Sequence, residues 1–227
     1  MRVRSALPVI ALGAASVLCI ATVEYRIRHT GDPFYRFLIW NLMLAWVPLV
    51  LALGASVCAE RRVWPLAGGL GVLWLLFFPN APYMLTDFIH LRQTVETPLW
   101  YDALMLSSFA WTGLLLGFAS LYVMQAVWRQ LAGSPLSWLG VLCALSLASF
   151  GVYLGRFMRF NSWDALLHPR RVVDVIRTQL DNPLTEPRLA ASLVVLTVSL
   201  SVGYVVLYSF AGLRSELDRP PRTLSRP

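Results

Sequence analysis

The chain has 227 residues, of which 57% are apolar and 14% are charged, and its mean hydropathy is +0.62. Soluble domains carry about 25% charged residues, so this composition argues against a soluble globular protein. The formal net charge of +7 comes from arginine alone, because the sequence contains no lysine. The arginines are spread over nearly every connector, which excludes the one-sided basic face of a nucleic-acid site. The expected partners are the lipid bilayer and its anionic headgroups, at about 1 kcal/mol per arginine.

Six long runs of the sequence contain no charged residue. They cover residues 5–23, 37–59, 63–86, 103–128, 130–155 and 189–213. A helix of about 20 residues crosses the hydrocarbon core of a bilayer, and each run is about that long or longer. The sequence therefore predicts an all-α fold, a polytopic transmembrane helical bundle of about six spans. It predicts one transmembrane domain over 1–213 and a disordered tail rich in arginine and proline at 214–227.

The second and third spans are joined only by Glu60-Arg61-Arg62, so they should run antiparallel side by side. The third span should end near Phe78, because Pro79 and Pro82 follow and proline cannot continue a regular helix. Further along, Gly133-Ser134-Pro135 predicts a tight turn between the fourth and fifth spans. Two small-residue motifs, Gly113-x-x-x-Gly117 and Gly151-x-x-x-Gly155, predict faces that another helix backbone can approach closely.

Two connectors, 79–102 and 156–188, are patterned like helices. Apolar residues recur at a spacing of three to four in Pro82–Arg92 and in Pro169–Leu180. In the first segment Tyr83, Asp87, His90 and Thr94 form a polar stripe opposite the apolar side. Such segments are typical of short helices at the membrane interface. With six spans both connectors lie on one membrane face, although nine arginines on one face against ten on the other leave the orientation open.

Several stretches of the sequence are similar to those of a known family. They are Trp40-Asn-Leu-Met-Leu-Ala-Trp-Val-Pro48, Pro79-Asn-Ala-Pro-Tyr-Met-Leu-Thr-Asp-Phe-Ile-His-Leu91, Trp100-Tyr-Asp102, Gly113-Leu-Leu-Leu-Gly-Phe-Ala-Ser-Leu-Tyr-Val-Met-Gln125 and Gly151-Val-Tyr-Leu-Gly-Arg-Phe-Met-Arg-Phe-Asn-Ser-Trp-Asp164. On these motifs the chain resembles domain-of-unknown-function family 1361, over roughly residues 35–210. The resemblance implies a multi-pass protein of a bacterial inner membrane. It implies no activity, because none is assigned to the family.

Ionisable residues gather on the membrane face that these two connectors share. Asp87-x-x-His90 puts a carboxylate and an imidazole on one helical face, where they could relay a proton or bind a metal. Asp102, Asp164 or His168 could complete such a site from the same side. The candidate catalytic residues are Asp87, His90 and Asp102. No HExxH or comparable signature occurs, so the sequence predicts neither a metal ligand set nor a cofactor.

Arg156 and Arg159 lie one turn apart where the fifth span ends. One interpretation is that both extend into the headgroup layer. The other is that they form an anion-binding pair, because guanidinium groups match the geometry of phosphate. Polar residues on the same face are candidates for structural hydrogen bonds; they are Asn41, Asn80, Asn161 and Asp164.

Three function classes remain open from the sequence. An interfacial membrane enzyme would use the candidate residues on a lipid-linked or phosphorylated substrate. A small-solute transporter would need a polar path across the bundle, lined by Ser107, Ser108, Thr112, Ser146 and Ser149. A scaffold or accessory subunit would use its connectors to dock a partner that the sequence does not identify. No charged residue lies near the centre of a span, which argues against an ion-coupled pump.

The acidic residues of connector 79–102 should pair with the arginines that end the fifth span. An unpaired charge near lipid costs several kcal/mol, and Gly151-x-x-x-Gly155 can bring this helix end close to a neighbour. We therefore predict Asp87 or Asp102 within salt-bridge reach of Arg156 or Arg159, with His90 nearby.

Overall fold

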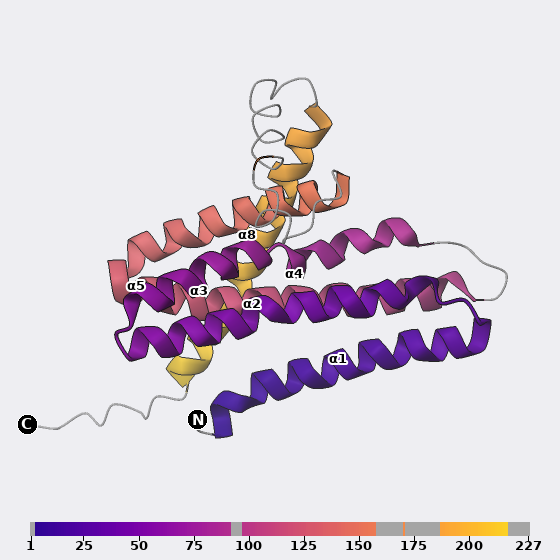
Figure 1. The fold of residues 1–227 in the computed structure, drawn as a ribbon, viewed down its shortest axis with the longest axis horizontal. Coiled ribbons are helices and arrows are strands. Elements are labelled where there is room, and N and C mark those ends of the chain that lie inside the picture. Colours follow the sequence, from indigo (N-terminus) through magenta and orange to yellow (C-terminus); the bar gives the residue numbers. More distant parts are fainter. Residues whose placement is uncertain (1–2, 92–96, 158–169, 171–186, 218–227) are drawn as a thin grey trace, which may run out of the picture.

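The computed structural model describes residues 3–91, 97–157, 170 and 187–217 (Figure 1). Predictions made for Arg159, Asn161, Asp164, His168 and the segment Pro169–Leu180 lie outside the described residues, except for position 170. The tail predicted from residue 214 also lies mostly outside them, although a helix continues as far as Leu217.

Every regular element that the structure describes is helical, which confirms the predicted all-α fold. In chain order the elements are α1 (Val3–Thr30), the 3-10 helix η1 (Phe34–Arg36), α2 (Phe37–Glu60), α3 (Trp64–Phe77), α4 (Asn80–Tyr83), the 3-10 helix η2 (Met84–His90), α5 (Leu99–Phe157) and α8 (Pro187–Leu217). Within the described residues, five helical segments are long and apolar enough to cross a membrane. One of them joins α3, α4 and η2 into Trp64–His90, and another is α5.

The helix α5 holds the fourth and fifth predicted spans on two arms, 99–132 and 134–157. The arms meet at Gly133, which has φ 79° and ψ 178°. Glycine adopts this conformation readily because it has no Cβ, and Pro135 falls in the first turn of the second arm, where a proline is tolerated. The predicted tight turn is confirmed, and the two arms run back along each other (Figure 1).

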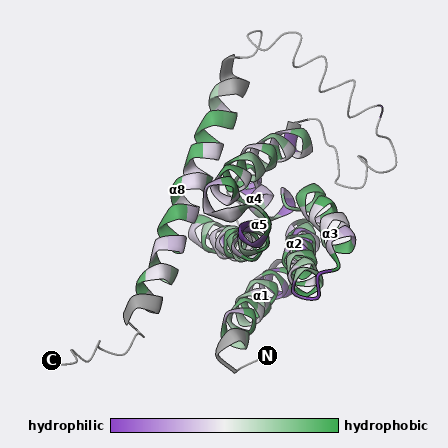
Figure 2. Ribbon diagram, turned by 90° about the vertical axis from the view of Figure 1, so that its left-hand side faces the viewer, coloured by the Kyte–Doolittle hydropathy of each residue, from purple (hydrophilic) through white to green (hydrophobic). Residues whose placement is uncertain are grey.

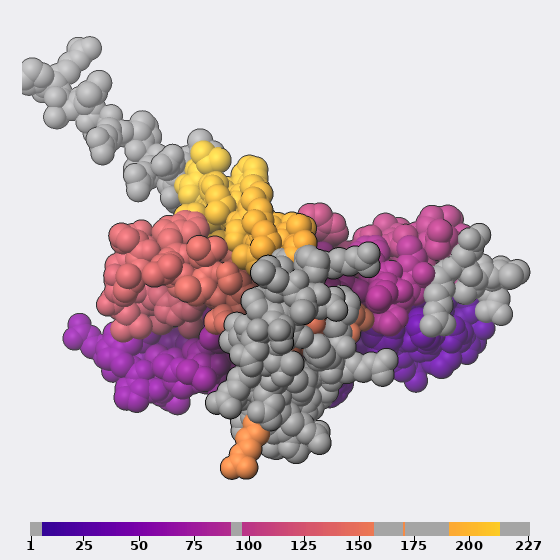
Figure 3. Space-filling view, turned by 90° about the horizontal axis from the view of Figure 1, so that it is seen from above, coloured from indigo at the N-terminus to yellow at the C-terminus, as the bar shows by residue number. Residues whose placement is uncertain are grey.

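The helices α1, α2, α3 and both arms of α5 lie side by side along the long axis of the molecule (Figure 1). Viewed along that axis in Figure 2, α2 lies between α1 and α3 and contacts α5. The helix α8 crosses the bundle steeply and packs against α5. Figure 3 shows α8 at the edge of the molecule. Large apolar side chains face outward, among them Val72 at 70% exposure, as expected for helices surrounded by lipid.

The third predicted span is broken at Pro79, close to the predicted end at Phe78. The helix α3 ends at Phe77 and α4 begins at Asn80, and the Asn80 side-chain amide donates a hydrogen bond of 2.8 Å to the Phe77 carbonyl. The side-chain amide thus satisfies one of the carbonyls left unpaired at the end of α3.

Both arms of α5 approach this break through glycines. A Cβ at Gly113 would lie 2.7 Å from Met84 Sδ and 2.8 Å from the Ala81 carbonyl oxygen, and one at Gly151 would lie 2.5 Å from Pro79 Cγ. A Cβ at Gly117 would lie 3.0 Å from Ala81 Cβ. The predicted close-packing role is confirmed for these three glycines. Because they have no side chain, the two arms can pack closely against α4 and the residues that flank it.

The α2–α3 turn has an arginine where glycine is usual. Arg62 has φ 59°, in the left-handed region that costs an L-residue about 1–2 kcal/mol. The Arg62 amide donates to the Ala59 carbonyl at 2.9 Å and the Val63 amide to the Cys58 carbonyl at 2.9 Å. This is the Schellman pattern, whose left-handed position is most often glycine.

Candidate functional site

The end of the second arm of α5 is held to η2 by one arginine. The Arg156 Nη2 donates to Asp87 Oδ1, and its Nε donates to Thr86 Oγ1 at 2.8 Å. Its guanidinium carbon also lies 4.4 Å from the centre of the Tyr83 ring. The predicted pairing of Arg156 with Asp87 is confirmed. We refer to Asn41, Tyr83, Thr86, Asp87, His90 and Arg156 as the Arg156 cluster.

His90 lies next to this ion pair, as predicted. Its Nε2 is 3.1 Å from Arg156 Nη1. An arginine can only donate, so this contact is a hydrogen bond when Nε2 is the accepting nitrogen of the ring. His90 is half-buried and its ring packs edge-on against Phe34 and Phe37.

The carboxylate of Asp87 faces the interior of the bundle. Asp87 is 1% exposed, whereas Phe88 and Ile89 on the same segment are 38% and 70% exposed. The Asn41 amide of α2 donates to the second oxygen, Oδ2, at 3.1 Å. The segment is helical, as predicted, but it presents Asp87 inward and apolar residues outward, because two partners on other helices stabilise the carboxylate there.

Asp102 pairs with a different arginine from the one predicted. The Arg26 Nε lies 2.8 Å from Asp102 Oδ1 and Nη2 lies 3.2 Å from Oδ2. The two side chains are 2% and 0% exposed, and Asp32 approaches Arg26 Nη1 at 3.7 Å. This Arg26 pair, formed by Arg26 and Asp102, joins α1 to the first arm of α5.

Tyr35 connects the Arg26 pair to the Arg156 cluster. Its ring centre lies 4.5 Å from the Arg26 guanidinium carbon, and its hydroxyl donates to the His90 carbonyl at 2.7 Å. The buried polar contacts of α1, α2, η2 and α5 therefore meet at one end of the bundle. This end, where α1 ends and α2 begins, is called the charged end below.

Sequence reasoning missed Arg26 and Tyr35. The first uncharged run ends at residue 23, before Glu24 and Arg26, but α1 continues to Thr30. The buried residues Cys19, Val23 and Arg26 recur at helical spacing, and extending that stripe past Glu24 would have placed Arg26 on the inner face. Tyr35 offered no comparable signal, because its neighbours Phe34 and Phe37 are equally aromatic.

The hydroxyls named for a transport path each bond within their own helix. Ser107, Ser108, Thr112 and Ser149 donate to carbonyls one turn earlier, and so does Ser146, which faces outward. Among the described residues, no group of three or more His, Cys, Asp or Glu side chains is placed to hold a metal ion.

These features define an all-α membrane protein with two buried ion pairs at one end of its helices. The chain belongs to the family described as protein of unknown function (DUF1361), whose model matches residues 40–203. The resemblance drawn from the motifs is thereby confirmed, and the matched region contains the whole Arg156 cluster. No curated protein and no solved structure matches the chain.

Proposed function

We propose that the chain is a multi-pass protein of a bacterial inner membrane that acts at the membrane interface on a lipid-linked or phosphorylated substrate. The Arg156 cluster would be its site. The observation that supports this most directly is that the cluster is buried on one side and partly exposed on the other. A buried carboxylate holds Arg156 from the inside, while Tyr83, His90 and Arg156 itself keep part of their surface exposed.

Arg156 is the anion-binding group in this proposal. A guanidinium has five N–H donors, and contacts to Thr86, His90 and Asp87 engage three of them. The remaining donors suit two oxygens of a phosphate group. Since Asp87 and Asn41 fix the arginine in advance, an arriving anion would not have to order it, which is the benefit of a preorganised site.

His90 would transfer the proton. In the absence of an anion its Nε2 faces Arg156 Nη1 and can accept a hydrogen bond from it. A phosphate bound to Arg156 would bring negative charge beside the imidazole and favour its protonated form, so His90 could then act as a general acid. Asp87 would orient Arg156 and His90 without touching the substrate.

The other predicted site residues have different places in this proposal. Asp102 is fully buried against Arg26, which favours a structural role over a catalytic one. Asn41 donates to Asp87 and Asn80 donates to the Phe77 carbonyl, which favours structural roles for both. Arg159, three residues after Arg156, stays a candidate for a second anion-binding group.

Stabilisation by a phosphate-bearing lipid tests the proposal. The protein in detergent micelles is melted with and without a short-chain polyprenyl phosphate, and with the matching polyprenol. A ligand at 100 times its Kd stabilises the folded state by about 2.7 kcal/mol, so the phosphate should raise the Tm clearly and the alcohol should not.

Two variants locate the effect. Arg156→Lys keeps the charge but loses the planar fork, and it should remove most of the rise in Tm. The matched control is Arg129→Lys on the first arm of α5, because Arg129 is exposed and contacts only Tyr208 by its side chain among the described residues. Equal stabilisation by the alcohol, or full stabilisation of Arg156→Lys, would contradict the proposal.

A scaffold or accessory subunit is the second candidate. The observation that favours it is that Asp87 already neutralises Arg156. Under this alternative the Arg156 cluster only fastens η2 to α5, and polyprenyl phosphate should leave the Tm of wild type unchanged.

A further inference from the structure

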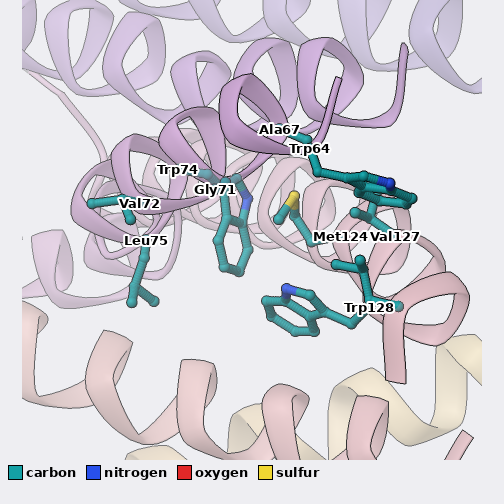
Figure 4. A pocket seen from close by; sticks show the side chains of 11 residues that line it. Trp64, Ala67, Gly71, Val72, Trp74, Leu75, Met124, Val127 and Trp128 are labelled. Atoms are coloured by element: carbon teal, nitrogen blue, oxygen red, sulfur yellow. The ribbon is translucent and has the colours of Figure 1, made fainter. Parts of the chain in front are cut away.

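A groove lies at the end of the bundle opposite the charged end. It has a volume of about 330 Å³ and runs between α3 and the first arm of α5. On α3 the small residues Ala67, Gly68 and Gly71 leave space for the groove. On α5 the groove is bounded by Met124, Val127, Trp128 and Leu131. Figure 4 shows the indoles of Trp64, Trp74 and Trp128 arranged around it. The volume lies at the lower end of the range for ligand pockets, about 300–1,000 Å³.

The indoles around the groove are held in fixed positions. Trp74 is fully buried and donates to Ser120 Oγ at 3.2 Å. Trp128 stands edge-on to Trp74, with ring centres 5.6 Å apart, and Gly140 of the second arm leaves room for it, since a Cβ there would lie 2.9 Å from the Trp128 ring. The hollow is therefore part of the packing and does not depend on a mobile side chain.

The groove opens toward the membrane. Its outer edges include Val72 at 70% and Leu131 at 57% exposure, and both belong to segments long and apolar enough to cross a bilayer. An apolar hollow on such a surface is filled by lipid hydrocarbon, because water there would lack hydrogen-bond partners.

Two arginines stand in the α2–α3 turn, directly before the segment of α3 that lines the groove. Arg61 and Arg62 are exposed and precede Trp64, whose amphipathic ring is of the type that marks the headgroup level. Neither arginine makes a side-chain hydrogen bond or ion pair with another described residue. Arg62 also occupies a left-handed position at which glycine is favoured. Because this backbone conformation is unfavourable for arginine, its occurrence here indicates a role for the Arg62 side chain. Glu60 is exposed beside them, so this turn has a net charge of +1.

We propose that the groove binds one acyl chain of an anionic phospholipid whose phosphate is held by Arg61 and Arg62. The apolar wall selects hydrocarbon, and the arginines select an anionic headgroup over a zwitterionic one. The site is separate from the Arg156 cluster, since it lies at the other end of the helices, and it does not rest on the function proposed above.

The chain offers a matched pair of variants to test the groove. Gly68 lines it and Gly69 does not, and a Cβ at either position would meet nothing within 4 Å. Gly68→Leu should therefore fill the groove without a clash, and Gly69→Leu makes the same change on the neighbouring outward face. Both replace a helical glycine and should fold at least as well as wild type.

The measurement is native mass spectrometry of the protein in micelles titrated with phosphatidylglycerol or with phosphatidylcholine. For wild type and Gly69→Leu we expect phosphatidylglycerol to bind about tenfold more tightly than phosphatidylcholine. Gly68→Leu should weaken the binding of both lipids about tenfold. The double variant Arg61→Gln/Arg62→Gln should keep phosphatidylcholine binding and lose the preference for phosphatidylglycerol.

Three outcomes would overturn the proposal. Equal lipid binding by Gly68→Leu and Gly69→Leu would place the lipid elsewhere. An unchanged headgroup preference in the double arginine variant would remove the phosphate contact. A dimer that is present in wild type and lost in Gly68→Leu would show that the groove receives a second copy of this chain.

Discussion

The two buried ion pairs at the charged end differ in how many residues share the charge. In the Arg26 pair both side chains are at most 2% exposed and the two nitrogens of one fork face the two oxygens of one carboxylate. In the Arg156 cluster the arginine is 11% exposed and divides its donors among three residues of η2. The first arrangement fixes one helix against another, whereas the second leaves the arginine partly exposed.

Burial also sets how much stability is lost when one member of each ion pair is removed. Removing one member of a buried pair leaves an uncompensated charge, which costs about 3–5 kcal/mol. Arg26 has few other contacts to compensate it, since its Nη1 has no hydrogen-bond partner and approaches only Asp32. Asp87 would still keep Asn41 after the loss of Arg156. The Arg26 pair should therefore be the more sensitive of the two.

The largest effect is expected for Asp102→Leu. It leaves the Arg26 guanidinium buried without its carboxylate and should lower the free energy of unfolding by about 3–5 kcal/mol, measured by denaturant titration in mixed micelles. Adding Arg26→Met should recover part of this loss, because the double variant has no stranded charge. The effect of Arg26→Met is measured both in wild type and in Asp102→Leu. If it lowers the stability by the same amount in the two backgrounds, the two residues are not coupled.

A smaller loss is expected for Arg156→Leu, about 2–3 kcal/mol, because Asp87 keeps one partner and the site is partly open to solvent. Adding Asp87→Asn should restore some of the stability by removing the remaining charge. The same unfolding measurement gives the coupling energy, and strictly additive losses would show that the predicted and observed contact contributes nothing.

Gly151→Ala should disturb the Arg156 cluster and leave the Arg26 pair intact. The added Cβ would meet the Pro79 ring at 2.5 Å, which pushes the second arm of α5 away from α4 and should cost about 1–3 kcal/mol. Gly13→Ala is the control, since a Cβ there meets nothing within 4 Å, and it should be neutral or slightly stabilising. In the Gly151→Ala background, the coupling between Arg156 and Asp87 should shrink while that between Arg26 and Asp102 stays the same. Equal shrinkage of both couplings would show that the two regions respond as one, and unchanged coupling at both would show that the Gly151 contact does not position the Arg156 cluster.

The smallest effect is expected for His90→Gln. Glutamine keeps an acceptor for Arg156, so the loss should stay below about 0.5–1.5 kcal/mol, the net value of one hydrogen bond. His90→Leu should lose more, because it leaves an Arg156 donor unsatisfied. Equal unfolding free energies for the two variants would mean that the hydrogen bond to Arg156 does not stabilise the fold.

The sequence by itself determined the helices and one ion pair. In lipid, backbone N–H and C=O groups find no water to bond with. An uncharged run of transmembrane length therefore forms a helix, in which every backbone group bonds within its own segment. Pro79 and Gly133 mark where helices end or turn through purely local constraints on the backbone. The contact of Asp87 with Arg156 could be predicted because two charges at adjacent, apolar helix ends have few other partners.

Tertiary structure alone decided which arginine meets Asp102 and which way Asp87 faces. The sequence offered Arg156 and Arg159 as partners for Asp102, and only the packing of α1 against the first arm of α5 brings Arg26 to it. The inward turn of Asp87 depends on Asn41 and Arg156, which come from helices far away in the sequence. Local spacing specifies which residues share a helical face, but the partner that makes burial of a charge favourable is known only when the helices are assembled.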